Sequence, residues 1–256
     1  MKTNHLKLLT KAILTAKNQL KGLVGPGYYR EFRGQLIFQT KPERSKLDKT
    51  KNKNAPVLRK LSSAIRYIRC HIESHLNNLH DSYMHSRLLG QLIRIVHKDT
   101  TKPLEQRTLH NVNFGDLSGF EFNNNTMFKD TFLNPISVTT TENRLTAYIP
   151  AFVPKEQVDF PKGCTQALIR LYLIAIQAGD RLTKDADEVR QVSIEFNREQ
   201  PIVQETTWTC PSMVEEEKFE VMVADIQFFY PINNTLHRTS LYNTKAFNPS
   251  MIIYAK

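Results

Sequence analysis

The apolar positions in the first hundred residues recur mostly at helical spacings. Before the glycine-rich stretch 22–27, apolar residues three or four apart form one stripe, and lysines occupy many of the other positions. This pattern predicts an amphipathic helix that ends where glycine and proline begin. The stripe consists of Leu6, Leu9, Ile13, Ala16 and Leu20. Such a basic helix could dock on its own protein or on a neighbouring subunit, or lie on an anionic membrane.

A short β-hairpin is predicted after the glycine-rich stretch. Residues 28–32 and 35–40 are two runs of β-forming residues on either side of Arg33-Gly34. The segment 41–54 that follows is rich in lysine and contains almost nothing apolar. Because such a segment cannot bury itself, it is predicted to be a loop or arm.

Two further helical stripes predict a helical hairpin. Pro56 suits the first turn of a helix, Asn77-Asn78 marks a break, and Asp81 or Ser82 could cap the second helix. The apolar faces are formed by Leu58, Leu61, Ile65, Ile68, Ile72 and Leu79, and by Leu88, Leu89, Leu92, Ile93 and Val96.

From about residue 114 the helical periodicity gives way to short β-rich runs separated by turn residues. The eight runs are 136–141, 144–153, 166–177, 189–196, 202–210, 219–230, 237–242 and 251–254. They predict an antiparallel β-sandwich, immunoglobulin-like or jelly-roll-like. The expected fold class is α+β, with a basic helical region carrying a short β-hairpin and a lysine-rich arm over 1–110, and the sandwich domain over 111–256.

The charge of the chain is divided in the same way. Residues 1–110 hold 22 lysines and arginines against 7 aspartates and glutamates, a net charge of +15, whereas residues 111–256 hold 13 against 18, a net charge of −5. This asymmetry points to a polyanionic partner or an electrostatically steered contact. The alternative is that the lysines only make an exposed helical surface soluble.

Basic side chains of the arm and of the next helix are the candidates for binding a polyanion or a partner. Tyr28, Tyr29 and Phe32 of the β-hairpin could stack on unpaired bases, or else pack the hairpin onto the helices. The basic candidates are Lys41, Arg44, Lys46, Lys49, Lys51, Lys53, Arg59, Lys60, Arg66 and Arg69.

The sequence carries no motif of a known catalytic site. It contains no GxxxxGK[ST], GxSxG or HExxH pattern, and its three cysteines form no CxxC pair. His71 and His75 would share a helix face at metal-ligand spacing, but a third ligand is not evident, so polar histidines on a helix flank are the favoured interpretation. We therefore expect no catalytic residue, no metal, no cofactor and no enzymatic activity.

No segment predicts a membrane crossing or export. The longest apolar run, 168–178, is interrupted by Arg170, falls short of about 18 residues, and is predicted to be a buried strand. Lys7 and Lys11 interrupt the apolar stretch near the N-terminus, where an export signal needs an uninterrupted apolar centre. A cytoplasmic protein is expected, with association with a phage or another particle as an alternative.

Several segments resemble a family of uncharacterised proteins common in Bacteroidota. The matching pieces are LSGFEFN (117–123), IPAFVP (149–154), PKG (161–163), YNTKAFNPSMIIYA (242–255), LRKLSSAIR (58–66) and HSRL (85–88). The resemblance implies a basic N-terminal region, a β-rich C-terminal domain, no export signal and no catalytic motif. It carries over no functional residue, and the arm 41–54 is richer in lysine than the family pattern.

Two functions are consistent with these patterns. The leading hypothesis is a non-enzymatic structural or assembly protein that forms a homo-oligomer or a larger complex through its basic arm and helices. The alternative is a nucleic-acid-associated protein that binds the phosphate backbone of DNA or RNA through residues 41–69.

Overall fold

The computed structural model describes residues 12–14, 20–24, 27–32, 35–40, 62, 66, 69–98, 100, 103, 113–141, 143–177, 189–213, 218–231 and 239–256. The chain divides into two compact units, Met1–Lys53 and Asn54–Lys256. The boundary predicted near residue 110 therefore falls inside the second unit.

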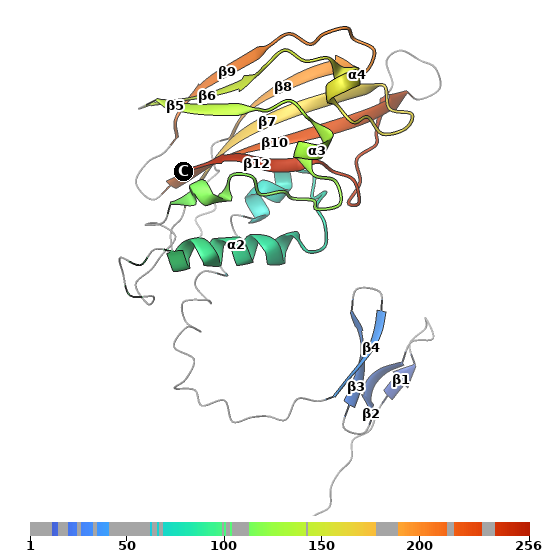
Figure 1. Ribbon diagram of the computed structural model, residues 1–256. Coiled ribbons are helices and arrows are strands. Elements are labelled where there is room, and N and C mark those ends of the chain that lie inside the picture. The colour runs from blue at the N-terminus through green and yellow to red at the C-terminus, as the bar shows by residue number, and fades with distance from the viewer. Residues whose placement is uncertain are drawn as a thin grey trace, which may run out of the picture. The chain divides into compact units, whose positions relative to one another are not determined.

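The first unit contains a four-stranded antiparallel sheet with the strand order β1-β2-β3-β4. Its strands are β1 (Ala12–Leu14), β2 (Leu20–Val24), β3 (Gly27–Phe32) and β4 (Gln35–Thr40) (Figure 1). The predicted β-hairpin is confirmed, because β3 pairs with β4 along its whole length. The predicted N-terminal helix is wrong at residues 12–14 and 20–21, which belong to strands β1 and β2.

The wrong helix has a physical explanation. A few apolar residues three and four apart fit a helical stripe, but a short apolar run is equally compatible with a strand. Here β2 extends the hairpin, with Leu23 opposite Tyr28 and Gly22 opposite Tyr29. Pairing with a strand further along the chain therefore outweighs the local helical preference.

The second unit contains two antiparallel sheets. The five-stranded sheet has the order β11-β10-β7-β8, and β12 also pairs with β10; the three-stranded sheet has the order β5-β6-β9. The strands are β5 (Ser137–Thr141), β6 (Arg144–Ile149), β7 (Gln166–Gln177), β8 (Val189–Asn197), β9 (Thr206–Pro211), β10 (Lys218–Pro231), β11 (Thr239–Leu241) and β12 (Ser250–Ala255). The prediction of a β-rich, antiparallel C-terminal part is confirmed.

Helices precede these sheets. Residues 69–75 are helical, and α2 (Met84–Lys98) is the second helix of the predicted hairpin. Between them, Asn77 and Asn78 adopt positive φ angles of 54° and 55°, which few residues other than glycine and asparagine tolerate. Three short helical turns follow, namely η3 (Phe114–Leu117), α3 (Phe128–Thr131) and α4 (Pro154–Gln157).

The central strands β7 and β10 of the five-stranded sheet are buried on both faces, and in Figure 1 helices lie on one side of this sheet and the three-stranded sheet on the other. Tyr172 and Ile174 of β7 pack with Leu88 and other residues of the helices, whereas Leu171 and Leu173 pack toward the three-stranded sheet. A strand buried on both faces has no polar side, so its sequence is a continuous apolar run. The prediction that 168–178 contains a buried strand is thus confirmed by β7 over its described part.

Candidate functional site

Most of the predicted polyanion-binding residues lie outside the described residues. These are Lys41, Arg44, Lys46, Lys49, Lys51, Lys53, Arg59 and Lys60. Arg66 is helical and exposed. Arg69 is also helical, and its Nε lies 3.5 Å from Oε1 of Glu73, one turn further along. The Arg69 guanidinium thus already has an acidic neighbour within the chain.

The predicted stacking residues all belong to β3. Tyr28 and Tyr29 are half-buried and, as successive residues of a strand, lie on opposite faces of the sheet. The Tyr28 hydroxyl donates to Oε1 of Gln39 over 3.2 Å. Tyr29 instead packs on Phe38, with ring centroids 4.9 Å apart. Phe32 ends the strand, and its side chain is outside the description.

The face that carries Tyr29 is apolar and exposed. Leu36 and Phe38 of β4 have exposed fractions of 46% and 48%. The Phe38 ring also lies over Gly27, where a Cβ atom would overlap it. Gly27 therefore provides the room that the aromatic ring of Phe38 occupies.

The histidines of the helical hairpin contact residues of their own unit. The ring of His75 packs on that of Tyr172, with centroids 5.6 Å apart. His80 Nε2 lies 3.0 Å from Oε1 of Glu73. Burial, together with the neighbouring His71 and Arg170, lowers the pKa of His75. Within the described ranges, no group of three or more histidine, cysteine or acidic residues is placed to hold a metal ion.

A buried ion pair links the two central strands. Arg170 of β7 faces Asp225 of β10, and its guanidinium donates to both carboxylate oxygens, from Nε over 2.9 Å and from Nη2. The guanidinium also lies over the ring of Tyr172, 5.0 Å from its centroid. Burial raises the pKa of Asp225 to about 6, although the hydrogen bond from Arg170 and its positive charge act to lower that pKa.

A second buried carboxylate lies in β10. Glu220 is fully buried, and its Oε1 accepts hydrogen bonds from the Ser212 hydroxyl over 2.8 Å and from the Met213 N–H. Its Oε2 and the Tyr254 hydroxyl are buried without a hydrogen-bond partner. Burial and the nearby charge of Glu220 raise the pKa of Tyr254 to about 12.

A polar cleft of about 620 Å³ lies beside the start of α2. In this cleft the guanidinium of Arg87 donates to the carboxylate of Asp81 over 2.5 Å. The same guanidinium also donates to the backbone carbonyl of Glu121 over 2.6 Å. Burial alone would raise the pKa of Asp81, but the N–H groups of Asn124 and Tyr83 and the Arg87 guanidinium hold it below its usual value. The cleft is lined by His80, Asp81, Ser82, Tyr83, Arg87, Asn124, Asn125, Lys245 and Ala246.

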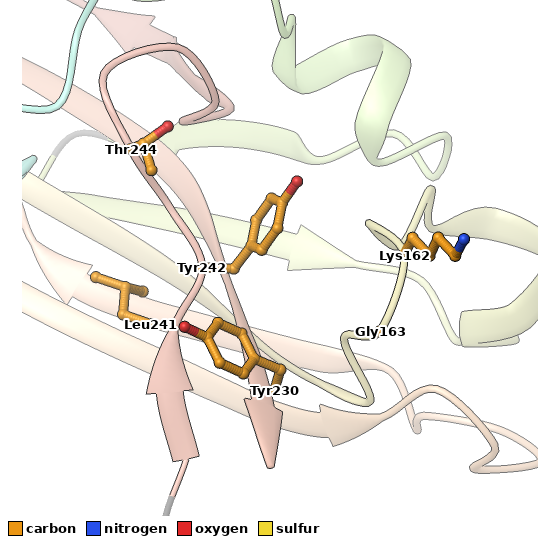
Figure 2. Close-up of a pocket in the computed structure, with 6 residues that line it drawn as sticks. All are labelled: Lys162, Gly163, Tyr230, Leu241, Tyr242 and Thr244. Carbon is orange, nitrogen blue, oxygen red and sulfur yellow. The ribbon is translucent and has the colours of Figure 1, made fainter. Parts of the chain in front are cut away.

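A second hollow of about 620 Å³ lies where β10 and β11 meet the turn that precedes β7. We refer to it as the tyrosine pocket; it is lined by Lys162, Gly163, Tyr230, Leu241, Tyr242 and Thr244. Figure 2 shows the two tyrosine side chains between Leu241 on one side and the Lys162-Gly163 turn on the other. The ammonium group of Lys162 points away from the rings (Figure 2).

The walls of the tyrosine pocket are held in place by the core. The ring of Tyr242 packs edge-on against Phe247, with centroids 5.2 Å apart, and Phe247 packs on Phe228. Thr244 and Phe247 exchange backbone hydrogen bonds of 2.9 and 3.1 Å. Gly163 has a φ of +87°, which a residue with a side chain rarely adopts. Glycine at this position therefore allows the turn that forms the other wall of the pocket.

The sequence did not indicate the tyrosine pocket. Tyr230 and Tyr242 each fell at the end of a predicted strand, where an aromatic residue is equally expected to pack in the core. The PKG turn at 161–163 was visible as a turn, but nothing in the sequence placed it next to the end of β10. Only the antiparallel pairing of β7 with β10 brings these segments together.

Taken together, the described elements define a β-rich protein with two units, of which the second has helices on one face of its larger sheet and a smaller sheet on the other. No protein-family model, curated protein or solved structure matches the chain. None of the helices in the described ranges combines the length and the apolar character that a bilayer crossing requires.

Proposed function

We propose that the chain is a non-enzymatic assembly protein that builds a larger complex through its basic N-terminal unit. The observation that carries the proposal is the distribution of charge between the two units. Residues 1–53 hold 13 lysines and arginines against 3 acidic residues, a net charge of +10, which equals that of the whole chain. Residues 54–256 hold 22 of each kind and are neutral.

Exposed apolar side chains support the same proposal. Leu36 and Phe38 lie on the small sheet of the unit whose sequence carries this charge, and β1 and β4 are the outer strands of that sheet. Outer strands and exposed apolar faces are features through which protein chains associate. The apolar stripe of α2, the second helix of the predicted hairpin, gives no such support, because Leu88, Leu92 and Val96 are buried within their own unit.

The partner in this assembly is a further copy of the chain. Within the neutral second unit, residues 111–256 carry a net charge of −5, complementary to the first unit. Contacts between different patches of identical chains join them head to tail, into rings or open filaments. The same proposal includes an immunoglobulin-like or jelly-roll-like class for the paired sheets, a cytoplasmic setting, and association with a phage or another particle.

Light scattering after size-exclusion chromatography of the full chain tests the proposal. We expect a species larger than one chain at about 50 mM salt that shrinks at about 1 M, where the Debye length falls to about 3 Å. Replacing Lys46, Lys49, Lys51 and Lys53 by alanine should have the same effect as high salt. The matched control replaces four exposed lysines of the second unit, Lys98, Lys129, Lys155 and Lys256, and should leave the size unchanged. A monomer at every concentration and salt would refute the proposal.

A second candidate function is binding to the phosphate backbone of DNA or RNA. The observation that favours it is the aromatic pair of half-buried Tyr29 and exposed Phe38 on the unit that carries the charge, since bases stack on aromatic rings next to basic groups. The four-alanine variant of the arm should reduce the slope of log affinity against log salt by about 3 to 4. An unchanged slope would exclude the arm from nucleic-acid binding.

A further inference from the structure

The polar groups that line the tyrosine pocket favour an acceptor-rich ligand. The Lys162 ammonium only donates hydrogen bonds, whereas the hydroxyls of Tyr230, Tyr242 and Thr244 donate or accept. Among the residues that the structure describes, no aspartate or glutamate lines the pocket. A ligand with a negative charge or several acceptor atoms therefore fits this lining better than one that mainly donates hydrogen bonds.

The apolar groups of the pocket favour a planar ring. Tyr230 and Leu241 have exposed fractions of 41% and 38%, so both leave apolar surface in water at the same hollow. Exposed aromatic and aliphatic groups that gather in a hollow mark binding sites more often than isolated ones do. A flat ring covers such surface without having to adapt its shape.

The pocket is also preorganised. The packing of Tyr242 on Phe247 and the backbone bonds between Thr244 and Phe247 fix one wall before any ligand arrives. A fixed wall reduces the entropy that is lost on binding. The volume of about 620 Å³ lies in the range of sites that take small molecules, about 300–1,000 Å³.

A single turn connects the pocket with the polar cleft. Thr244 lines the pocket, and the next residue, Lys245, lines the cleft together with Arg87. Lys245 is exposed, and in Figure 2 Lys162 lies across the pocket from Thr244. An anionic group of a ligand held in the pocket would be reached by the side chain of Lys245, or by that of Lys162 once its ammonium group, which points away from the rings, turns toward the pocket.

We propose that the tyrosine pocket binds a nucleotide, with the base against Tyr230 and Tyr242 and the phosphate at Lys162 or Lys245. A nucleotide combines the planar ring, the acceptor atoms and the negative charge that the lining of the pocket favours. The nucleotide is free or belongs to a single strand that continues over the cleft. The inference goes beyond both functions proposed above, since neither involves the second unit as a ligand site.

Fluorescence anisotropy with the full chain tests this inference. The probe is a labelled single strand of about four deoxyadenosines, a length within the usual site sizes. Unlabelled adenosine 5′-monophosphate serves as the competitor.

Tyr230→Leu keeps an apolar side chain but removes the ring, and should weaken binding between about fivefold and about 150-fold, the usual range for one stacked base. Tyr230→Phe is the matched control and should bind as the unaltered chain does. Lys162→Ala should reduce the salt slope by about one.

Each outcome has a defined meaning. Competition by the mononucleotide identifies a free nucleotide as sufficient, whereas loss of strand binding in Tyr230→Leu without such competition identifies a nucleotide within a strand; both support the inference. Unchanged affinity of Tyr230→Leu, or no binding by the unaltered chain, overturns it. If only the four-alanine variant of the arm loses binding, nucleic-acid binding through the arm stands and the pocket inference fails. If only Tyr230→Leu loses binding, the pocket inference stands and nucleic-acid binding through the arm fails.

Discussion

The ion pair between Arg170 and Asp225 offers the sharpest test of how the second unit is held together. The two residues are directly opposite each other on β7 and β10, and the exposed fractions of their side chains are 16% and 1%. We consider Arg170→Met, which removes the positive charge and keeps a long apolar side chain. Asp225 would then be a buried carboxylate without its cationic partner.

The expected loss of stability follows from this burial. Removing one partner of a buried ion pair costs about 3–5 kcal/mol, because the remaining charge is neither hydrated nor paired. With a urea dependence of about 2–3 kcal/mol per molar, a loss of about 4 kcal/mol lowers the urea midpoint by about 1.3–2 M. Replacing both residues by leucine should cost much less than Arg170→Met, and could even stabilise the unit, since no unpaired charge remains.

The measurement is urea unfolding of the full chain, followed by the fluorescence of Trp208. Trp208 is the only tryptophan of the chain; it lies in β9 and packs against the core between the two sheets. It therefore reports on unfolding of the second unit. The matched control is Arg144→Met, which removes an exposed arginine from β6 and should change stability by no more than about 0.5 kcal/mol.

Two results would refute this reasoning. If Arg170→Met costs less than about 1 kcal/mol, the pair behaves like an ion pair at the surface. If the double-leucine variant is as unstable as Arg170→Met, the loss comes from disturbed packing next to Tyr172 and not from the stranded charge.

Three further predictions concern the contacts around this sheet. Leu88→Ala should cost about 2–5 kcal/mol in the same Trp208 assay, because Leu88 is fully buried in the core that the helices share with the sheet; an unmoved transition would mean that the helices unfold independently. Glu121→Ala should cost about 1–2 kcal/mol by urea unfolding, because the buried carboxylate accepts the Phe128 N–H over 2.8 Å at the start of α3, and Glu121→Gln should restore part of that loss. His75 has a lowered pKa in the folded chain, so below its ordinary value of 6.5 the unfolded chain binds more protons and stability falls as the pH falls toward the folded pKa. His75→Asn should therefore reduce the difference in unfolding free energy between about pH 7.5 and about pH 5.5, and an unaltered difference would contradict this.

The prediction from sequence was strongest where a segment has only one way to bury its side chains. The mainly apolar runs of β7 and β10, which contain Arg170 and Asp225 as opposed charged residues, predicted strands, and both are strands with two buried faces. The break at Asn77-Asn78 and the stripe of α2 were also visible, because helix ends and helical periodicity are local properties. The prediction failed at residues 12–14 and 20–21, where a short apolar stretch fits either structure and a partner strand decides.

The candidate sites divide along the same line. The basic arm could be found from composition alone, because a lysine-rich segment without apolar residues needs no fold to be recognised. The tyrosine pocket could not be found in this way. Lys162 belongs to one segment, and Tyr230 and Tyr242 belong to another that begins almost seventy positions later in the chain. No spacing rule connects them.

By itself, the amino-acid sequence determined the β-rich character of the C-terminal part, the helical hairpin before it, and the concentration of positive charge in residues 1–110. These properties depend on side-chain type and short-range periodicity, which are present in the unfolded chain as well. Tertiary structure alone decided that the helices share a core with the sheet, that Arg170 faces Asp225, and that two tyrosines form one pocket. Each of these depends on strand register and layer packing, and a register is set by all of the contacts along two strands at once.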